Sequence, residues 1–138
     1  MPAAVRDLMT PNPTVLSAGT SIAEAARVMR DQDIGAVVVE TARGPAIATD
    51  RDIVVRGVAE GVDIDTIPVE AVCSREVTTI APDTTIAVAR ALMQEKALRR
   101  LLVLEGDQPV GVLSIGDVAV DQNAGAVLDS ISKAIPNR

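Results

Sequence analysis

Two aspartates each follow a hydroxyl residue by three positions, in Thr49-Asp50-Arg51-Asp52 and in Ser114-Ile115-Gly116-Asp117. An ionised carboxylate can accept hydrogen bonds from two neighbouring hydroxyl groups of a ligand such as a sugar, and the Ser or Thr hydroxyl can bind a further oxygen. The same residue types also begin helices without any ligand, because the hydroxyl caps the helix and the carboxylate stabilises its first turn. The pattern alone leaves both interpretations open.

The side chains that the sequence lacks exclude several kinds of site. There is no histidine, so a Ser-His-Asp triad, a Cys-His pair and a zinc site are excluded. The single cysteine, Cys73, can form no disulfide within the chain and is expected to be a small buried thiol. An enzyme would have to rely on aspartate pairs or on Lys96 and Lys133, which the spacing does not assemble into a catalytic group. We therefore expect no enzyme activity, no metal and no catalytic cofactor.

Charge and hydropathy limit the possible partners. The net charge is -6 and the pI is about 4.6, so the chain would repel nucleic acid and anionic membranes, and neither is an expected partner. No apolar run approaches the ~18 residues of a membrane span, and the N-terminus lacks the pattern of a secretion signal. Because Phe, Tyr and Trp are absent, a bound base would have to lie between aliphatic side chains. These features predict a cytoplasmic protein with a compact core.

The sequence repeats itself once. Val5 to Thr10 has its counterpart in Val69 to Ser74, an offset of 69 minus 5, or 64. The same offset relates two apolar helix stripes, Ile22, Ala25 and Met29 to Ile86, Ala89 and Met93. The two hydroxyl-and-aspartate motifs are related by 114 minus 49, or 65, so one residue is inserted between them, which we place near Leu104 beside a hairpin turn.

Local patterns predict the same element order in each copy: strand, helix, strand, strand, helix. Ser21 followed by Glu24 has the spacing of a capping box at the start of the first helix. An acidic stretch from Glu60 to Asp65 is interpreted as a linker. The other predicted elements are strands over 14–16, 36–39, 46–49, 78–80, 101–104 and 110–114, and helices over 85–96, from about Asp50 or Asp52 and from about Gly116.

These residues resemble the CBS domain, the small module named after cystathionine β-synthase that occurs in tandem pairs called Bateman modules. The family signature is complete in Gly111-Val112-Leu113-Ser114-Ile115-Gly116-Asp117, and the first copy keeps Thr49 and Asp52 but replaces the glycine with Ala46. With no catalytic domain attached, the chain is similar to small stand-alone CBS pairs of the actinobacterial hypoxic-response type. The resemblance implies an α/β (α+β) fold of two β-α-β-β-α repeats packed with pseudo-two-fold symmetry, with CBS domain 1 at 1–63 and CBS domain 2 at 64–138.

The resemblance also implies roles for individual residues. Asp52 and Asp117 would hold a ribose, with Thr49 and Ser114 beside them. Phosphate needs positive charge, for which the pair Arg99-Arg100 is the best candidate in this acidic chain. The first copy has Gly35-Ala36 at that place, so its phosphate contacts would come from Arg51, Arg56 or the other copy. The base would lie against the first strand of a copy, around Val15-Leu16 or Thr79-Ile80, under aliphatic side chains such as Val112.

We therefore expect a non-catalytic regulatory protein that binds an adenosine-type nucleotide, AMP, ADP, ATP or a related molecule, in the cleft between the repeats. A ligand-sensing module of this kind would act on a protein effector partner. The family precedent also implies a homodimer. The alternative is a ligand-free dimeric scaffold with empty clefts, which Ala46 and the missing arginine pair of the first copy favour.

Overall fold

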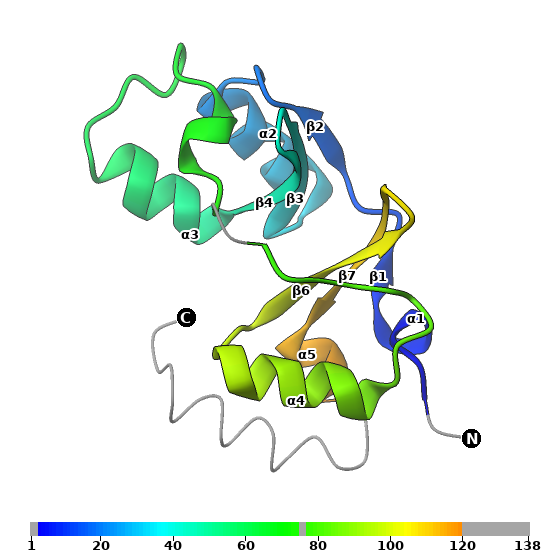
Figure 1. The fold of residues 1–138 in the computed structure, drawn as a ribbon. Coiled ribbons are helices and arrows are strands. Elements are labelled where there is room, and N and C mark those ends of the chain that lie inside the picture. The colour runs from blue at the N-terminus through cyan, green and yellow to red at the C-terminus, as the bar shows by residue number, and fades with distance from the viewer. Residues whose placement is uncertain (1–2, 75–76, 120–138) are drawn as a thin grey trace. The chain divides into compact units, whose positions relative to one another are not determined.

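A computed structural model describes residues 3–74 and 77–119 of the chain, which form two compact units. The central unit is the continuous segment Thr14–Val77. The discontinuous unit combines the N-terminal segment Met1–Pro13 with the chain from Thr78 onward. Each unit contains a small sheet with helices on one of its faces (Figure 1), so the fold is of the mixed α+β type that the sequence predicts.

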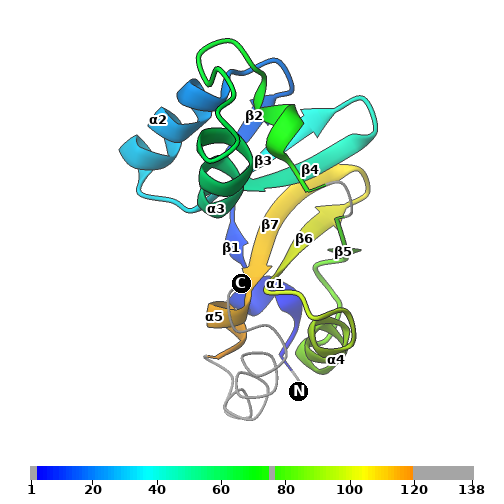
Figure 2. The same cartoon turned by 90° about the vertical axis from the view of Figure 1, so that its left-hand side faces the viewer.

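In the central unit, β2 pairs in parallel with β3, and β3 pairs antiparallel with β4. Figure 2 shows the helices α2 and α3 on one side of this sheet. The buried cluster of the unit includes the predicted helix stripe of Ile22, Ala25 and Met29, together with Val37 and Val39 of β3. The elements are β2 (Val15–Ser17), α2 (Ile22–Gln32), β3 (Ala36–Thr41), β4 (Gly44–Thr49), α3 (Asp50–Asp52), the π-helix η1 (Ile53–Val58) and the 3-10 helix η2 (Val69–Val72).

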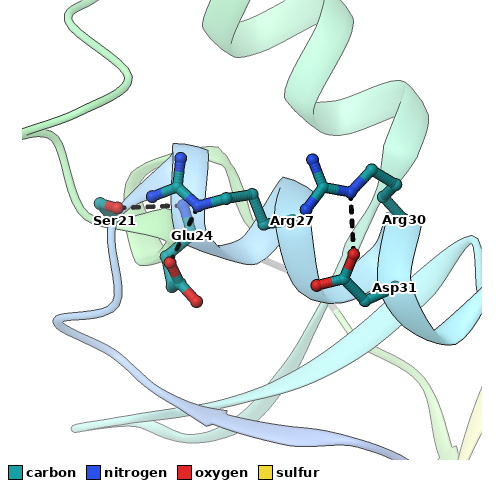
Figure 3. A network of polar contacts seen from close by, with 5 residues as sticks. All are labelled: Ser21, Glu24, Arg27, Arg30 and Asp31. Carbon is teal, nitrogen blue, oxygen red and sulfur yellow. Dashed lines mark hydrogen bonds and ion pairs between the residues drawn. The ribbon is translucent and has the colours of Figure 1, made fainter.

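Helix α2 begins as predicted, but only half of the expected capping box forms. The Ser21 hydroxyl accepts a hydrogen bond from the backbone N–H of Glu24 at 3.1 Å. The Glu24 carboxylate does not return to Ser21; it pairs with Arg27 on the exposed face of the helix at 3.0 Å (Figure 3). One turn later, Arg30 pairs with Asp31 at 2.8 Å in the same exposed row. Exposed pairs of this kind contribute little to stability, so this face is an ordinary solvated surface.

In the discontinuous unit, the sheet order is β1-β7-β6-β5, in which only the β5–β6 pair is parallel. Helices α1, α4 and α5 contribute to one buried cluster on one face of this sheet, including Val5, Met93 and Val118 packed with Leu101 and Leu113 (Figure 1). The elements are α1 (Val5–Leu8), β1 (Thr10–Pro11), β5 (Thr79–Ile80), α4 (Ile86–Lys96), β6 (Arg100–Glu105), β7 (Gln108–Ser114) and α5 (Ile115–Val118).

Each repeat gives its N-terminal segment to the unit that contains the rest of the other repeat. The backbone N–H of Val5 donates to the carbonyl of Thr84 at 2.8 Å, and its repeat counterpart Val69 donates to Thr20 at 2.7 Å. Both pairs are related by the offset of 64, so this docking hydrogen bond is repeated in the two exchanged segments. The compact units therefore divide the chain differently from the sequence repeats. The domain limits 1–63 and 64–138, and the pseudo-two-fold packing of the repeats, stay predictions.

The stretch interpreted as a linker is part of the central unit. Val62 and Ile64 pack against its buried cluster, and the carbonyl of Ile64 accepts a hydrogen bond from the N–H of Ala23 at 2.9 Å. The alternating acidic residues, such as Asp63 and Asp65, are exposed. The linker interpretation was based on the acidic residues of this stretch and overlooked Val62 and Ile64, which pack against the core.

The inserted residue of the second copy is a bulge in β7. Val103 pairs with Gly111 and Leu104 pairs with Pro109, which leaves Val110 as the extra residue. The corresponding pairs of the central sheet, Val39 with Ala46 and Glu40 with Pro45, follow one another without a gap. The insertion thus lies opposite the predicted position at Leu104, on the neighbouring strand.

Candidate functional site

Both hydroxyl-and-aspartate motifs form a complete capping box where a strand ends and a helix begins. The hydroxyl of Thr49 accepts a hydrogen bond from the N–H of Asp52 at 3.1 Å, and Oδ2 of Asp52 accepts one from the N–H of Thr49 at 2.9 Å. Ser114 and Asp117 make the same two bonds at 3.1 and 2.8 Å. The capping interpretation of the sequence is therefore correct for both motifs.

Capping leaves part of each carboxylate free to bind. Only Oδ2 of Asp117 is used in the capping box, and among residues 3–74 and 77–119 its Oδ1 has no hydrogen-bond partner. The same holds for Oδ1 of Asp52. Both aspartates are half-buried, so a ligand could reach them without unfolding the helix start. The fixed carboxylate is thus a preorganised acceptor.

The arginine pair lies directly beside the second motif. The carbonyl of Arg99 accepts a hydrogen bond from the N–H of Ile115 at 2.8 Å, and Arg100 is the cross-strand partner of Ser114. Arg99 is half-buried and Arg100 is exposed. Within the described part of the chain neither guanidinium forms an ion pair. Arg99, Arg100, Ser114 and Asp117 therefore lie within a few residues of one another in the chain or in strand register, at one end of the β6–β7 hairpin.

Strand register decides which other predicted residues share this face of the sheet. Thr79 pairs with Leu102, which pairs with Val112, so these three side chains point to the same face, as do those of Arg100 and Ser114 two residues further along. Ile80 pairs with Val103 and points to the other face, where it packs against the buried cluster. The side chain of Ile80 therefore belongs to the core, and only its backbone remains for a ligand.

One residue of this face was not predicted. Thr10 of β1 pairs with Val112, so it stands in the same row as Thr79 although it comes from the first repeat. The sequence signal was the counterpart of Val5 to Thr10 in Val69 to Ser74, but a repeat does not tell which sheet a segment joins.

The Thr49–Asp52 motif of the first copy has the same backbone contacts as the Ser114–Asp117 motif but lacks the two arginines beside it. The N–H of Asp50 donates to the carbonyl of Gly35 at 3.0 Å, and Ala36 is the cross-strand partner of Thr49. Gly35 and Ala36 thus occupy the places of Arg99 and Arg100. The sheet face beside Thr49 carries Val15, which is 44% exposed and occupies the place of Thr79.

The two arginines expected to serve this corner are positioned differently from each other. Arg51 is exposed in the first turn of α3. The guanidinium of Arg56 donates to the carbonyl of Cys73 at 3.2 Å, which ties it to the segment after η2. No described contact joins either guanidinium to Thr49 or Asp52.

Cys73 is buried, as the sequence predicts. Burial, with smaller contributions from the negative charges of Asp52 and Glu70, raises the pKa of its thiol to about 11, while Arg56 acts in the opposite direction. A thiol of this kind is protonated near neutral pH and is a poor nucleophile. Among the described residues no group of three or more His, Cys, Asp or Glu side chains could hold a metal ion.

The chain belongs to the CBS domain family, whose family description matches residues 5–57 and 69–120. It is therefore a tandem CBS pair, as the resemblance predicted.

Two relatives span most of the chain. The CBS domain-containing protein YhcV of Bacillus subtilis is 37% identical over 133 residues, which cover 93% of this chain and 94% of the relative. Hypoxic response protein 1 of Mycobacterium tuberculosis is 29% identical over 116 residues, which cover 83% of this chain and 81% of the relative. A crystal structure of Hypoxic Response Protein I with two coordinated zinc ions matches with a TM-score of 0.73 and 28% identity, over 86% of this chain and 98% of that one. The chain is thus a CBS-pair protein of the regulatory type.

Proposed function

We propose that this CBS-pair protein binds an adenosine-type nucleotide, such as AMP, ADP or ATP, in the cleft between its repeats and transmits the binding to a protein partner. It is a sensor in this proposal and carries out no reaction. The second motif is the principal site, because it combines Ser114 and Asp117 with the arginine pair.

The observation that carries the proposal is that the backbone brings Arg99 and Arg100 beside the Ser114–Asp117 capping box at the end of the β6–β7 hairpin. The free Oδ1 of Asp117 can accept hydrogen bonds from ribose hydroxyls, which charge assistance strengthens. Arg99 and Arg100 supply positive charge for phosphate oxygens in a chain whose net charge is -6. Thr79 and Val112 lie on the same face of the sheet on either side of the fully buried Leu102, and a base would lie along the outer part of this row. The equivalent corner at Asp52 lacks the two arginines, so we expect it to bind phosphate more weakly.

The proposal includes self-association. Val54, Val55 and Val58 of the π-helix η1 are 58%, 42% and 57% exposed, an apolar surface that a second copy could cover. A homodimer remains an expectation from the family. The zinc ions named for the Hypoxic Response Protein I structure are not part of the proposal, because this chain has no histidine and one cysteine. Among the described residues no helix is long and apolar enough to span a membrane; the cytoplasmic location stays a prediction.

A charge-neutral replacement of Asp117 tests the site. Asp117→Asn keeps an oxygen that can accept the capping hydrogen bond but loses the charge, so nucleotide affinity should fall by about tenfold or more, measured by titration calorimetry. Asp7→Asn is the matched control, because Oδ2 of Asp7 accepts the N–H of Ala4 at 3.0 Å in a capping interaction of the same unit. The control should lose some stability and no affinity.

Two results would contradict this assignment. Equal affinity of Asp117→Asn and Asp7→Asn would mean that Asp117 only caps its helix. If no adenine nucleotide binds the unmodified protein at all, the alternative function as a ligand-free dimeric scaffold becomes the better account, with Ala46 and Gly35-Ala36 as its supporting features.

A further inference from the structure

Gly111 leaves the space that Met9 fills. A Cβ atom built on Gly111 would overlap the sulfur of Met9 and would lie 2.9 Å from Cγ of Met9 and 3.0 Å from the carbonyl oxygen of Thr10. The backbone of Gly111 is outside the left-handed region, so its conformation does not require glycine. The requirement comes from the N-terminal segment that docks on β7, in which Met9 packs against the buried cluster.

The central unit has the same arrangement with different side chains. Gly111 minus 65 is position 46, which is Ala46, and Met9 plus 64 is position 73, which is Cys73. Ala46 and Cys73 belong to one buried cluster. Their chain neighbours are joined by the hydrogen bond from the N–H of Ser74 to the carbonyl of Ile47 at 3.3 Å. In the discontinuous unit a small strand residue, Gly111, is paired with the large Met9. In the central unit the larger strand residue, Ala46, is paired with the smaller Cys73.

We infer that these two pairs are matched in size, and that the match determines which N-terminal segment docks on which sheet. The segment that carries Met9 fits beside Gly111, and the segment that carries Cys73 fits beside Ala46. By analogy with the overlap at Gly111, we expect a methionine at position 73 to be crowded by Ala46. On this inference, the packing of Cys73 explains why Ala46 departs from the family signature.

The backbones of β7 and β4 also differ where the two N-terminal segments dock. The bulge at Val110 lies directly before Gly111, and its carbonyl accepts a hydrogen bond from the N–H of Asn12 at 3.2 Å. In the central sheet the pairing of β3 with β4 runs through Ala46 without a bulge. A segment that follows the edge of β7 therefore meets a different backbone path from one that follows β4.

A double-mutant cycle on the full chain without nucleotide tests the inference. Gly111→Ala should lower the folding equilibrium constant by roughly tenfold or more, measured by chemical denaturation and far-UV circular dichroism. Adding Met9→Cys should recover a large part of that loss, although the contact with the Thr10 carbonyl remains. If Gly111→Ala fails to fold, recovery of a cooperative transition in the double variant supports the inference, and failure of both variants overturns it.

A reciprocal cycle and a crossed cycle complete the test. Cys73→Met should destabilise the protein, and Ala46→Gly should compensate when combined with it. In the crossed pair, Gly111→Ala with Cys73→Met, the two effects should add. Additive effects within each matched pair would overturn the inference, as would compensation in the crossed pair. The nucleotide plays no part in these measurements, so their outcome is independent of the proposed ligand.

Discussion

At the scale of single residues, each motif aspartate has two carboxylate oxygens, of which the capping box uses one. Spacing alone predicted that Thr49 and Ser114 would begin helices, because a hydroxyl three residues before an acidic residue satisfies two backbone donors at once. The same spacing does not show whether the second oxygen faces a ligand. The case for a ligand at this oxygen depends on the neighbouring Arg99 and Arg100. The hairpin register, in which Arg100 pairs with Ser114, places them there.

The sequence could not decide the direction of Ile80. Strand β5 contains two residues, and the inward or outward direction of each is set by its parallel pairing with β6. Periodicity needs a longer run than Thr79-Ile80 to show which residue enters the core. Thr79 therefore joins the candidate site by its side chain, and Ile80 does not.

The raised pKa of Cys73 makes stability depend on alkaline pH. The unfolded thiol ionises near 9.0, whereas burial keeps the folded thiol protonated up to about 11. The folded state then binds the proton that the unfolded state releases, so this contribution is complete below pH 9 and is lost as the pH rises toward 11. Comparison with Cys73→Ala isolates it, since other titrating groups are shared. From pH 9 to pH 11, we expect the free energy of unfolding of the unmodified protein to fall relative to that of Cys73→Ala.

The measurement is urea denaturation of both proteins at intervals from pH 8 to pH 11, followed by circular dichroism. A difference that stays constant over the whole range would show that the thiol ionises freely in the folded state.

At the scale of elements, the two long helices end in the same strained way. The residue after α2 is Asp33 and the residue after α4 is Ala97, and both have a φ of 55°. Alanine is poorly suited to this left-handed conformation, which costs about 1–2 kcal/mol, whereas Asp tolerates it better. Glycine has no such cost but loses about 0.4–1 kcal/mol through the entropy of the unfolded chain.

We therefore expect Ala97→Gly to stabilise the protein by about 0.5–1 kcal/mol and Asp33→Gly to change stability less. Thermal unfolding followed by circular dichroism measures both. A lower melting temperature for Ala97→Gly than for the unmodified protein would refute this account of the helix end.

Local patterns predicted most elements but few of the contacts between them. The strand and helix ranges agree with the structure within a few residues, because the apolar stripe of Ile22, Ala25 and Met29 and the β-branched run at 36–39 are strong signals. The change from α3 into the π-helix η1 was not predicted, since it depends on hydrogen bonds such as that from the N–H of Ala59 to the carbonyl of Val54 at 2.8 Å. No residue type in this segment predicts the change from an α-helix to a π-helix.

At the scale of the whole molecule, the exchange of N-terminal segments makes the units interdependent along the chain. The central unit is one continuous segment, whereas the discontinuous unit needs residues 1–13. Val5 is fully buried in its core, and β1 covers the edge of β7. The repeat in the sequence does not show this arrangement, because each segment has the same local pattern wherever it docks.

Removal of residues 1–11 should therefore unfold the discontinuous unit and leave the central unit folded. Hydrogen exchange read by mass spectrometry should show lost protection over β6 and β7 and retained protection over β3 and β4. Equal loss in both units would mean that they fold as one cooperative body, and protection of β6 and β7 without the segment would show that it is dispensable.

The most direct test of the proposed function is equilibrium dialysis of the nucleotide-free protein against AMP, ADP, ATP, NAD and S-adenosylmethionine, read by absorbance at 260 nm. The chain has no Phe, Tyr or Trp, so it scarcely contributes to absorbance at this wavelength and bound nucleotide is measured directly. We predict that at least one of these ligands accumulates on the protein side in a saturable way, and that Asp117→Asn weakens this accumulation by about tenfold or more. Equal concentrations on both sides for every ligand would contradict the proposal.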